Sequence, residues 1–402
     1  MSIKQLTKAI LLLPAAIILV FLRLLRPVLK IEIMIVAFHR FGHLALEPEV
    51  MLCRTERDAK NSPHTKVLPK TIRLWSLGPR RLQANRFLAK KWSEVITSLP
   101  SWVIDALVKA GERFPNIKLA SPKLSIQRQD NSLDESLPHL RFSDSEIREA
   151  KSALETIGID PNRKYVCLVV RDGGHYEALG ITESPIDAMI NFDISDFELA
   201  AAALVDRGYQ VVRMGAGTEK PMAKRINGVF DYSLSRHRSE FLDIYLAANC
   251  EFALSTQTGP DAVCLAFRRP VCYVDVTRFS QFFFGTKIAY WSPSKITLNG
   301  RPLILREIVS GDLAWLKTPD DFERAGLDGV HSTPEEIMKL ANGFTDLFEG
   351  GLIMAADDLA MSVKAQEIIS DGLGQRGRDA FGRITAQINP AFLREHGEWF
   401  LS

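Results

Sequence analysis

The sequence has 402 residues, more than a single hydrophobic core usually contains, and this length favours two domains. Hydrophobic residues make up 46% of the chain and charged residues 24%, which fits a globular protein and excludes a disordered or multi-spanning one. The 50 Lys and Arg residues against 48 Asp and Glu give a net charge of +2, so nothing points to a nucleic-acid partner.

Before the first strand-like run lies an apolar segment of 14 residues, Ala9 to Leu22. Basic residues flank it on both sides: Lys4, Lys8, Arg23, Arg26 and Lys30. The run is shorter than the ~20 residues of a spanning helix, and no small-x-small cleavage site follows it. We expect residues 1–30 to form a membrane-associating helix, either an anchor or a helix lying on the surface. A buried core helix is the alternative.

The next stretch reads as the first strand and helix of an α/β domain. Ile31–Phe38 is continuously apolar, which is typical of a strand buried on both faces of a parallel sheet. A glycine-containing turn and an amphipathic stretch over residues 44–52 follow. Residues 85–117 have mostly helical spacing, and residues 118–142 are polar and interrupted by prolines, as in a linker. We therefore expect a Rossmann-like N-terminal domain over residues 31–142.

A second α/β domain begins at Ser143, where Ser143 or Asp144 can cap a helix that ends near Ile157. Strand-like runs at 165–170, 209–213, 252–254 and 271–274 alternate with helical runs at 194–206, 241–248, 259–267 and 334–349. This alternation predicts a parallel sheet over residues 143–349. Residues 350–402 read as a partly helical tail. The expected fold is α/β, with two Rossmann-like domains facing a cleft.

The five cysteines are an odd number, and no Cys-x-x-Cys pair occurs. Cys167 and Cys272 lie within apolar, strand-like runs. Buried free thiols in a reducing compartment are the simplest interpretation, so we expect the body of the protein in the cytosol.

Polar residues follow the first strand, where open α/β sheets bind ligands. His43 stands two residues after Phe41 in this turn, and Glu49 lies further along the helical stretch. An imidazole gains and loses a proton near neutral pH, so His43, or failing that Glu49, is a candidate general base. A histidine that packs on or caps the helix is the alternative.

Three arginines in the second domain are candidates for neutralising a diphosphate: Arg171, Arg213 and Arg238. Arg171 and its neighbour Asp172 follow one strand, and Arg213 with Gly215 ends the next. A guanidinium pairs with phosphate oxygens through two parallel hydrogen bonds. An ordinary surface loop with an Arg–Asp pair is the alternative.

A turn rich in hydroxyl side chains connects another strand to a helix. It contains Ser255, Thr256, Thr258 and Gly259. Free backbone N–H groups and the helix dipole make such a turn an anion site, whereas helix capping alone needs only one of these residues. No Asp-x-Asp triplet and no cluster with metal-ligand spacing occurs, so we expect no metal.

The chain resembles a family of bacterial proteins from surface-polysaccharide loci that are assigned as glycosyltransferases of the two-Rossmann-domain type, GT-B. The resemblance covers most of residues 31–349. Five stretches carry it: RFGHLALEPEVML, YVCLVVRDGGHY, YQVVRMG, RSEFLDIYLAANCEFALSTQTGP and STPEEIMKL. In the family a Tyr-Arg-Asn-like triplet follows the Arg-Asp pair. Ile190-Asn191-Phe192 stands in that place, so the resemblance implies a binding role for Asn191.

The resemblance implies an enzyme that transfers a hexose or deoxyhexose from a nucleotide-diphosphate sugar to a lipid-linked glycan or lipopolysaccharide, at the cytoplasmic face of the inner membrane. The nucleotide sugar is a co-substrate, and no further cofactor is implied. Two alternatives stay open. One is a nucleotide-sugar epimerase of the same fold, and the other is a non-catalytic, membrane-associated scaffold of a polysaccharide assembly complex.

Overall fold

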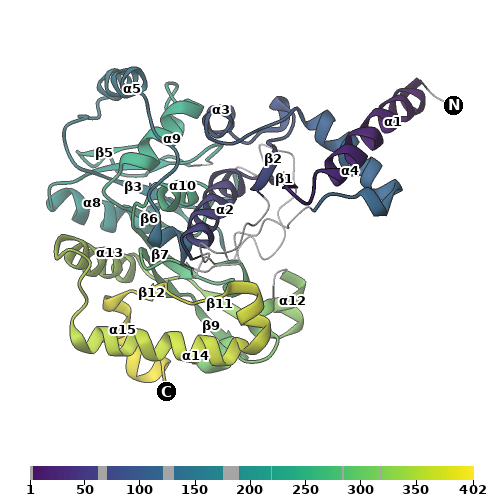
Figure 1. Cartoon of the computed structure of the whole chain (residues 1–402). Coiled ribbons are helices and arrows are strands. Elements are labelled where there is room, and N and C mark those ends of the chain that lie inside the picture. Colours follow the sequence, from purple (N-terminus) through teal and green to yellow (C-terminus); the bar gives the residue numbers. More distant parts are fainter. Residues whose placement is uncertain are drawn as a thin grey trace. The chain divides into compact units, whose positions relative to one another are not determined.

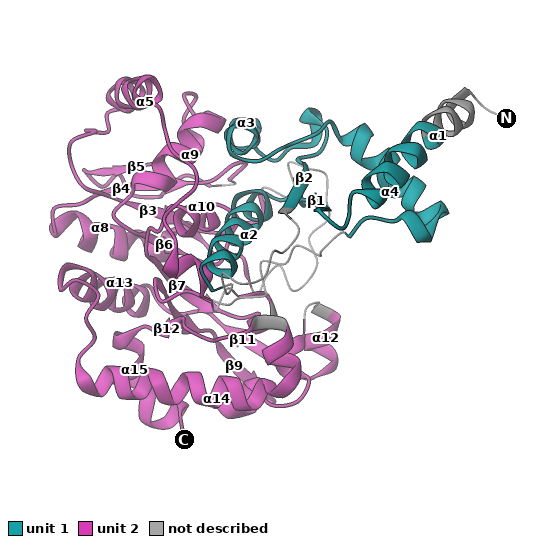
Figure 2. Ribbon diagram, in the orientation of Figure 1, with its two compact units in different colours: residues 1–125 teal, residues 126–402 magenta. Residues whose placement is uncertain are grey.

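The computed structural model describes residues 3–61, 70–120, 131–174, 190–218, 220–282, 285–316 and 319–402 (Figure 1). The chain is a mixed α/β protein with two compact units, Met1–Ser125 and Ile126–Ser402 (Figure 2). Their boundary falls inside the polar stretch 118–142. The His-Tyr end of the YVCLVVRDGGHY stretch lies outside the described residues.

Unit 1 is built on a parallel strand pair. Strand β1 (Leu29–Ile35) pairs with β2 (Lys70–Ser76) in a register that runs from Leu29↔Lys70 to Ile35↔Ser76. Three helices accompany them: α2 (Phe41–Asn61), α3 (Arg86–Val95) and α4 (Ser101–Arg113). The stretch 85–117 is therefore two helices, with Pro100 at the start of the second. In the described part of unit 1 the sheet consists of these two strands. This is fewer strands than a Rossmann-like domain, which we expected here, usually contains.

The N-terminal helix α1 (Ile3–Leu24) belongs to unit 1. Its Ala15 and Leu19 are buried in one cluster with Ile33 of β1 and with Ile104 and Leu107 of α4. The described part of α1 thus packs against the rest of unit 1. No helix among the described residues is both long and apolar enough to cross a membrane.

Unit 2 contains a sheet of seven strands in the order β12-β8-β7-β6-β3-β4-β5, and every neighbouring pair is parallel. Its strands are β3 (Tyr165–Val169), β4 (Gln210–Met214), β5 (Val229–Phe230), β6 (Ala253–Ser255), β7 (Val271–Val276), β8 (Ala289–Pro293) and β12 (Gln387–Ile388). Every residue of β3, β4, β6, β7 and β8 is buried, which explains their largely apolar sequences.

The helices in the described part of unit 2 are α5 (Asp144–Thr156), α8 (Glu198–Asp206), α9 (Glu240–Asn249), α10 (Asp261–Ala266), α11 (Leu305–Val309), α12 (Pro319–Arg324), α13 (Pro334–Glu349), α14 (Ala356–Phe381) and α15 (Pro390–Phe400). Helix α5 begins as predicted, because the Ser143 side chain accepts a hydrogen bond from the backbone of Glu146, whose carboxylate accepts one from the Ser143 N–H. Thr333 and Glu336 cap α13 in the same way.

Two parts of unit 2 differ from expectation. A small antiparallel sheet of β10 (Arg301–Pro302), β9 (Lys295–Leu298) and β11 (Leu327–Val330) follows the main strands. The stretch expected as a tail instead supplies α14, α15 and the edge strand β12, which pairs with β8. All five cysteines are free and buried, as predicted.

Strand β3 marks the point at which the order of the sheet reverses. From β3 the chain order runs outward through β4 and β5 on one side, and through β6, β7 and β8 on the other. The connections after β3 and β6 therefore diverge, and open α/β sheets bind ligands beyond the carboxyl ends of the strands at such a point.

Candidate functional site

Two of the predicted binding residues meet at this reversal point. Arg171 follows β3, and Thr256 follows β6. The backbone N–H of Arg171 donates a hydrogen bond of 2.8 Å to Thr256 Oγ1, and the N–H of Thr256 donates one of 3.1 Å to the carbonyl of Val169. The two strand ends are thus joined side by side, with a guanidinium on one and a hydroxyl on the other.

Asn191 positions the guanidinium of Arg171. Its Oδ1 accepts a hydrogen bond of 3.0 Å from Arg171 Nε, and the backbone N–H of the next residue, Phe192, donates to the Arg171 carbonyl at 2.8 Å. A guanidinium held at Nε has a fixed plane, which favours two-point pairing with a phosphate. Arg171, Asn191 and Thr256, each singled out from the sequence, are therefore neighbours.

The turn between β6 and α10 already holds a carboxylate. Asp261 Oδ2 accepts hydrogen bonds from Ser255 Oγ at 2.8 Å and from the Thr258 N–H at 2.6 Å. Ser255 is fully buried, so it shapes the turn and does not reach the surface. From the sequence we expected these donors to bind an external anion. In the structure the chain's own carboxylate takes two of them, and Thr256, the Thr258 hydroxyl and Gly259 remain candidates.

Asp261 has an unusual protonation equilibrium. Burial raises the pKa of its carboxyl to about 7, although hydrogen bonds from Ser255, Thr258 and Tyr273 act in the opposite direction. The group therefore exists as a mixture of the neutral and ionised forms near neutral pH. A neutral Asp261 places no negative charge beside a phosphate.

Arg213 is placed differently from Arg171. Its side chain is 1% exposed, and its guanidinium contacts Asp231 at 2.9 Å and Asp172 at 3.5 Å. The buried charge is thus balanced inside the domain, which favours a structural role over the phosphate-binding role expected for Arg213 and Asp172. Gly215 has φ of 156°, and a Cβ there would lie 2.7 Å from Thr218 Cγ2, so this turn needs glycine.

Arg238 also has a carboxylate partner. Arg238 lies just before α9, and its Nη2 donates a hydrogen bond of 2.6 Å to Oδ2 of Asp243, which lies within α9. Burial raises the pKa of Asp243 to about 6, and the adjacent Arg238 charge opposes this shift. The pair fixes the start of α9. The role expected for Arg238 in binding a diphosphate remains a prediction.

In unit 1, His43 lies in the first turn of α2 and is oriented by Glu47. His43 Nδ1 lies 2.8 Å from Glu47 Oε1, and Glu47 Oε2 accepts a hydrogen bond of 3.0 Å from the Ala37 N–H at the end of the β1 segment. The Glu47 side chain is 4% exposed and that of His43 33%. A buried carboxylate that holds one ring nitrogen and leaves the ring partly exposed is an arrangement used by general bases. Glu47 belongs to the same polar stretch as His43 and Glu49 in the sequence, but no role was predicted for it.

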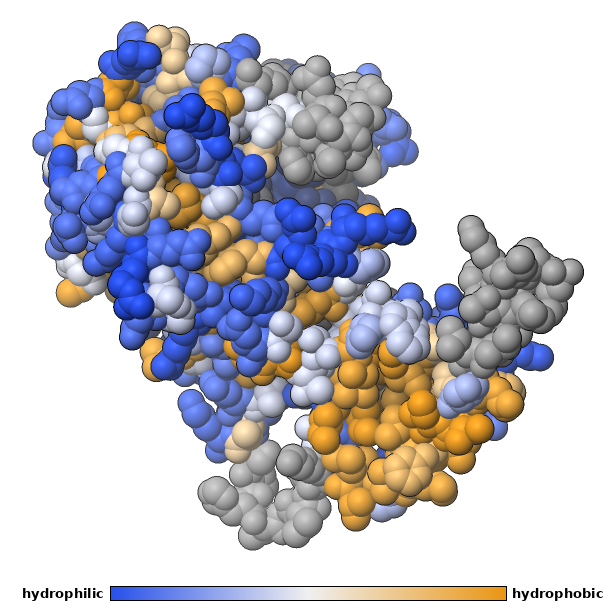
Figure 3. All heavy atoms as spheres, turned by 90° about the horizontal axis from the view of Figure 1, so that it is seen from above, coloured by the Kyte–Doolittle hydropathy of each residue, from blue (hydrophilic) through white to orange (hydrophobic). Residues whose placement is uncertain are grey.

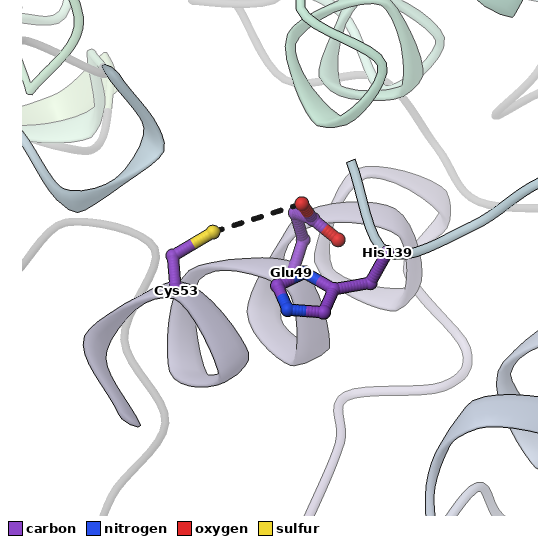
Figure 4. A group of neighbouring side chains, drawn as sticks. All are labelled: Glu49, Cys53 and His139. Carbon is purple, nitrogen blue, oxygen red and sulfur yellow. Dashed lines mark hydrogen bonds between the residues drawn. The ribbon is translucent and has the colours of Figure 1, made fainter. Parts of the chain in front are cut away.

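Glu49, the second candidate base, is fully buried in α2. Its Oε1 accepts a hydrogen bond of 3.6 Å from Cys53 Sγ one turn later, as Figure 4 shows; His139, also drawn there, belongs to unit 2. An acceptor hydroxyl has no access to a carboxylate without exposed surface. The position therefore favours His43 over Glu49 as the base.

A further polar group at the carboxyl edge of the sheet was not predicted from the sequence. Asp275, buried in β7 with φ of 54°, accepts hydrogen bonds of 2.7 Å from both the N–H and the hydroxyl of Ser332. His331 Nδ1 lies 3.8 Å from the same carboxylate, and its ring centroid lies 4.1 Å from that of Phe192, next to Asn191, with the two planes tilted by 47°. The signal was present, since Asp275 directly follows the predicted strand 271–274.

No protein-family model and no curated protein matches this sequence. The fold is similar to that of ADP-heptose lipopolysaccharide heptosyltransferase II from E. coli, at 12% identity over 81% of this chain and 100% of that one, with a TM-score of 0.45. It is also similar to a glycosyl transferase family 9 protein from Veillonella parvula, at 9% identity over 66% and 86% of the chains and a TM-score of 0.39. A third similar structure is the iron-containing heptosyltransferase TibC, at 12% identity, 81% and 78% coverage and a TM-score of 0.36.

Proposed function

We propose that this protein is a glycosyltransferase that binds a nucleotide-diphosphate sugar in unit 2. One observation carries the proposal: Arg171 and Thr256 are joined where the order of the sheet reverses, with Asn191 fixing the guanidinium. A cation and hydroxyl donors at the carboxyl ends of two diverging parallel strands suit a diphosphate.

The assignment of roles follows from the two sites. In unit 2, Arg171 balances the charge of the diphosphate, while Thr256, Thr258 and Gly259 supply hydroxyl and backbone donors. In unit 1, His43 accepts the proton of the acceptor hydroxyl, and Glu47 holds the imidazole in place. The acceptor oxygen forms a bond to the anomeric carbon of the sugar. The bond from that carbon to the phosphate oxygen breaks, and the nucleoside diphosphate leaves with the electron pair.

The proposal extends to the partners and the place of the reaction. The acceptor is a surface-polysaccharide or lipopolysaccharide glycan, reached at the cytoplasmic face of the inner membrane, and the transferred sugar is a hexose or deoxyhexose. The motif resemblance in the sequence supports this extension. No metal is needed, because Arg171 and the backbone donors neutralise the leaving group.

A thermal-shift screen of the purified protein with GDP-, UDP-, ADP-, CMP- and dTDP-sugars tests the donor site. We expect one nucleotide class to raise the melting temperature, because a ligand that binds only the folded state stabilises it. No shift with any of the five classes at millimolar concentration would contradict the donor site.

The same sugars distinguish the two alternatives. An epimerase changes the sugar of the bound donor without any acceptor, so the sugar recovered after incubation would differ in configuration. A scaffold would bind none of the donors. A transferase returns the donor unchanged until an acceptor is added.

A further inference from the structure

Helix α1 is apolar on two opposite faces. One face packs into unit 1, where Ala15 and Leu19 are buried, with Leu12 and Ala16 partly buried beside them. These positions repeat every three or four residues, as expected for the core-facing stripe of a helix. The fold of unit 1 therefore accounts for one face of α1 and leaves the apolar character of the other unexplained.

The other face of α1 is exposed to solvent. Leu13 is 68% exposed, Ile17 62%, Phe21 60% and Leu24 72%, and these residues follow one another along a single stripe of the helix. Ile18 and Val20 widen it, at 46% and 45%. Soluble proteins seldom expose a continuous apolar area of this kind, and such an area marks an interaction site.

Residues of α4 and the segment that follows it carry further exposed rings. Trp102 at the start of α4 is 60% exposed, and Phe114 at its C-terminal end is 48% exposed. Figure 3 shows hydrophobic side chains gathered in one area on the side where Figure 1 draws α1 and α4. Tryptophan is the residue most typical of the boundary between lipid and water.

Along the N-terminal segment itself the charges have one sign. Residues 1–31 contain five basic side chains and no acidic one. Arg23 and Arg26 are exposed at the end of α1, beside Leu24. Lys30 is paired with Glu32 at 2.7 Å. Basic residues that flank an apolar helix face are attracted to anionic phospholipid headgroups, each by about 1 kcal/mol.

We propose that unit 1 docks on an anionic lipid bilayer through the outward face of α1, with α1 lying in the plane of the membrane. Leu13, Ile17, Phe21 and Leu24 enter the acyl region, Trp102 lies at the interface, and Arg23 and Arg26 contact headgroups. A bilayer fits better than a second copy of the chain, because a two-fold contact through this face would bring the same arginines together.

The test is flotation of the full-length protein with vesicles of phosphatidylcholine alone or mixed with phosphatidylglycerol. The wild-type chain should float with the mixed vesicles. The variant Ile17→Gln/Phe21→Gln removes two exposed apolar side chains while keeping good helix formers, and should lower the partition coefficient on the order of 100-fold. Arg23→Gln/Arg26→Gln should lower it about 30-fold on the mixed vesicles and little on the neutral ones.

The matched control is Leu137→Gln/Ile353→Gln, which replaces two equally exposed apolar residues of unit 2, at 76% and 79% exposure, and should float like the wild type. Three results would overturn the proposal. The first is flotation of the folded Ile17→Gln/Phe21→Gln variant like wild type, and the second is no flotation of the wild type at all. The third is a wild-type dimer in solution that these substitutions convert to a monomer, which would make a second copy the occupant.

This inference rests on the proposed function and deepens it, because an acceptor glycan at the membrane requires the enzyme to reach the membrane surface. The two can fail separately. Flotation contains no nucleotide sugar, and the donor screen contains no lipid, so a chain that floats but binds no donor contradicts only the glycosyltransferase assignment.

Discussion

The guanidinium of Arg171 is the charge on which the donor site depends. The loss of a charge-assisted hydrogen bond to a buried anion costs roughly 1.5–3 kcal/mol, or about 10- to 150-fold in affinity. Arg171→Ala should weaken donor binding by that factor in calorimetry. Arg171→Lys should be intermediate, because an ammonium keeps the charge but cannot pair at two points. The control is Arg324→Ala at an exposed position of α12. Unchanged donor affinity in a cooperatively melting Arg171→Ala protein would mean that the site is misplaced.

His43 should affect the rate and not the affinity for the donor. Removing a general base typically costs about 100- to 10,000-fold in kcat, so His43→Ala should lose activity within that range. Glu47→Gln should cost less, since an amide oxygen still accepts a hydrogen bond from the imidazole or from Ala37. Both variants should bind the donor like wild type in calorimetry. A large loss of donor affinity in His43→Ala would place this residue in the donor site instead.

The residues of the candidate site were predictable to different degrees. Arg171 and Thr256 stood at the ends of strands recognisable as apolar runs, and parallel strands bring their carboxyl ends to one edge. The partners of Arg213 were not recognisable, because Asp172 and Asp231 approach it only once the sheet is formed. The contacts of Asp261 were not recognisable either: its carboxylate accepts hydrogen bonds from groups that we had assigned to a ligand because they are close in sequence. The contact between Asp275 and Ser332 also forms only in the folded sheet.

At the scale of elements, the turn from β6 to α10 should couple binding of the nucleotide sugar to the uptake of a proton by Asp261. The pKa of Asp261 is raised by burial to about 7, and a diphosphate nearby would raise it further, because a second negative charge disfavours ionisation. Donor binding near pH 7 should therefore take up a fraction of a proton, and affinity should fall as the pH rises through 7. Calorimetry in buffers of different ionisation enthalpy measures this uptake.

In that experiment Asp261→Asn is the matched variant, because it keeps the shape of the side chain but cannot titrate. Its binding enthalpy should not depend on the buffer. Proton release on donor binding by the wild type would contradict the placement of the diphosphate beside this turn.

Helix α1 offers a matched pair of leucines for stability. Leu19 is fully buried, whereas Leu13 is 68% exposed. Leu19→Ala should lower the free energy of unfolding of unit 1 by about 2–5 kcal/mol, because it leaves a cavity in the core. Leu13→Ala should change it by about 0.5 kcal/mol or less. Thermal unfolding followed by circular dichroism compares the two. Equal effects would show that α1 does not pack on the rest of unit 1 in solution.

Some helices and strands could be predicted from the sequence and others could not, for physical reasons. Strong local signals, such as the helix cap predicted at Ser143 and the helical spacing of residues 334–349, placed α5 and α13 correctly. For α1 a buried core helix was only the alternative prediction, since an apolar helix has the same sequence whether a core or a lipid covers it. The antiparallel strands β9, β10 and β11 were missed, because their short, mixed sequences have no clear alternation.

For the whole molecule, the absence of a metal requirement is testable. Arg171 and backbone N–H groups are expected to neutralise the diphosphate in place of a divalent cation. Sugar transfer should therefore proceed at an unchanged rate in excess EDTA. A complete loss of activity that added Mn²⁺ or Mg²⁺ restores would show that a metal takes part.

The position of β12 in the sheet has a consequence for synthesis on the ribosome. Tyr290 and Trp291 of β8 pair with Gln387 and Ile388 of β12, the last strand of unit 2 in chain order. Until β12 has left the exit tunnel, the backbone edge of β8 has no partner on that side, and an open apolar edge is prone to pair with other chains. The nascent chain must therefore keep this edge covered or delay its collapse, which makes the interval between the synthesis of β8 and that of β12 a period of aggregation risk.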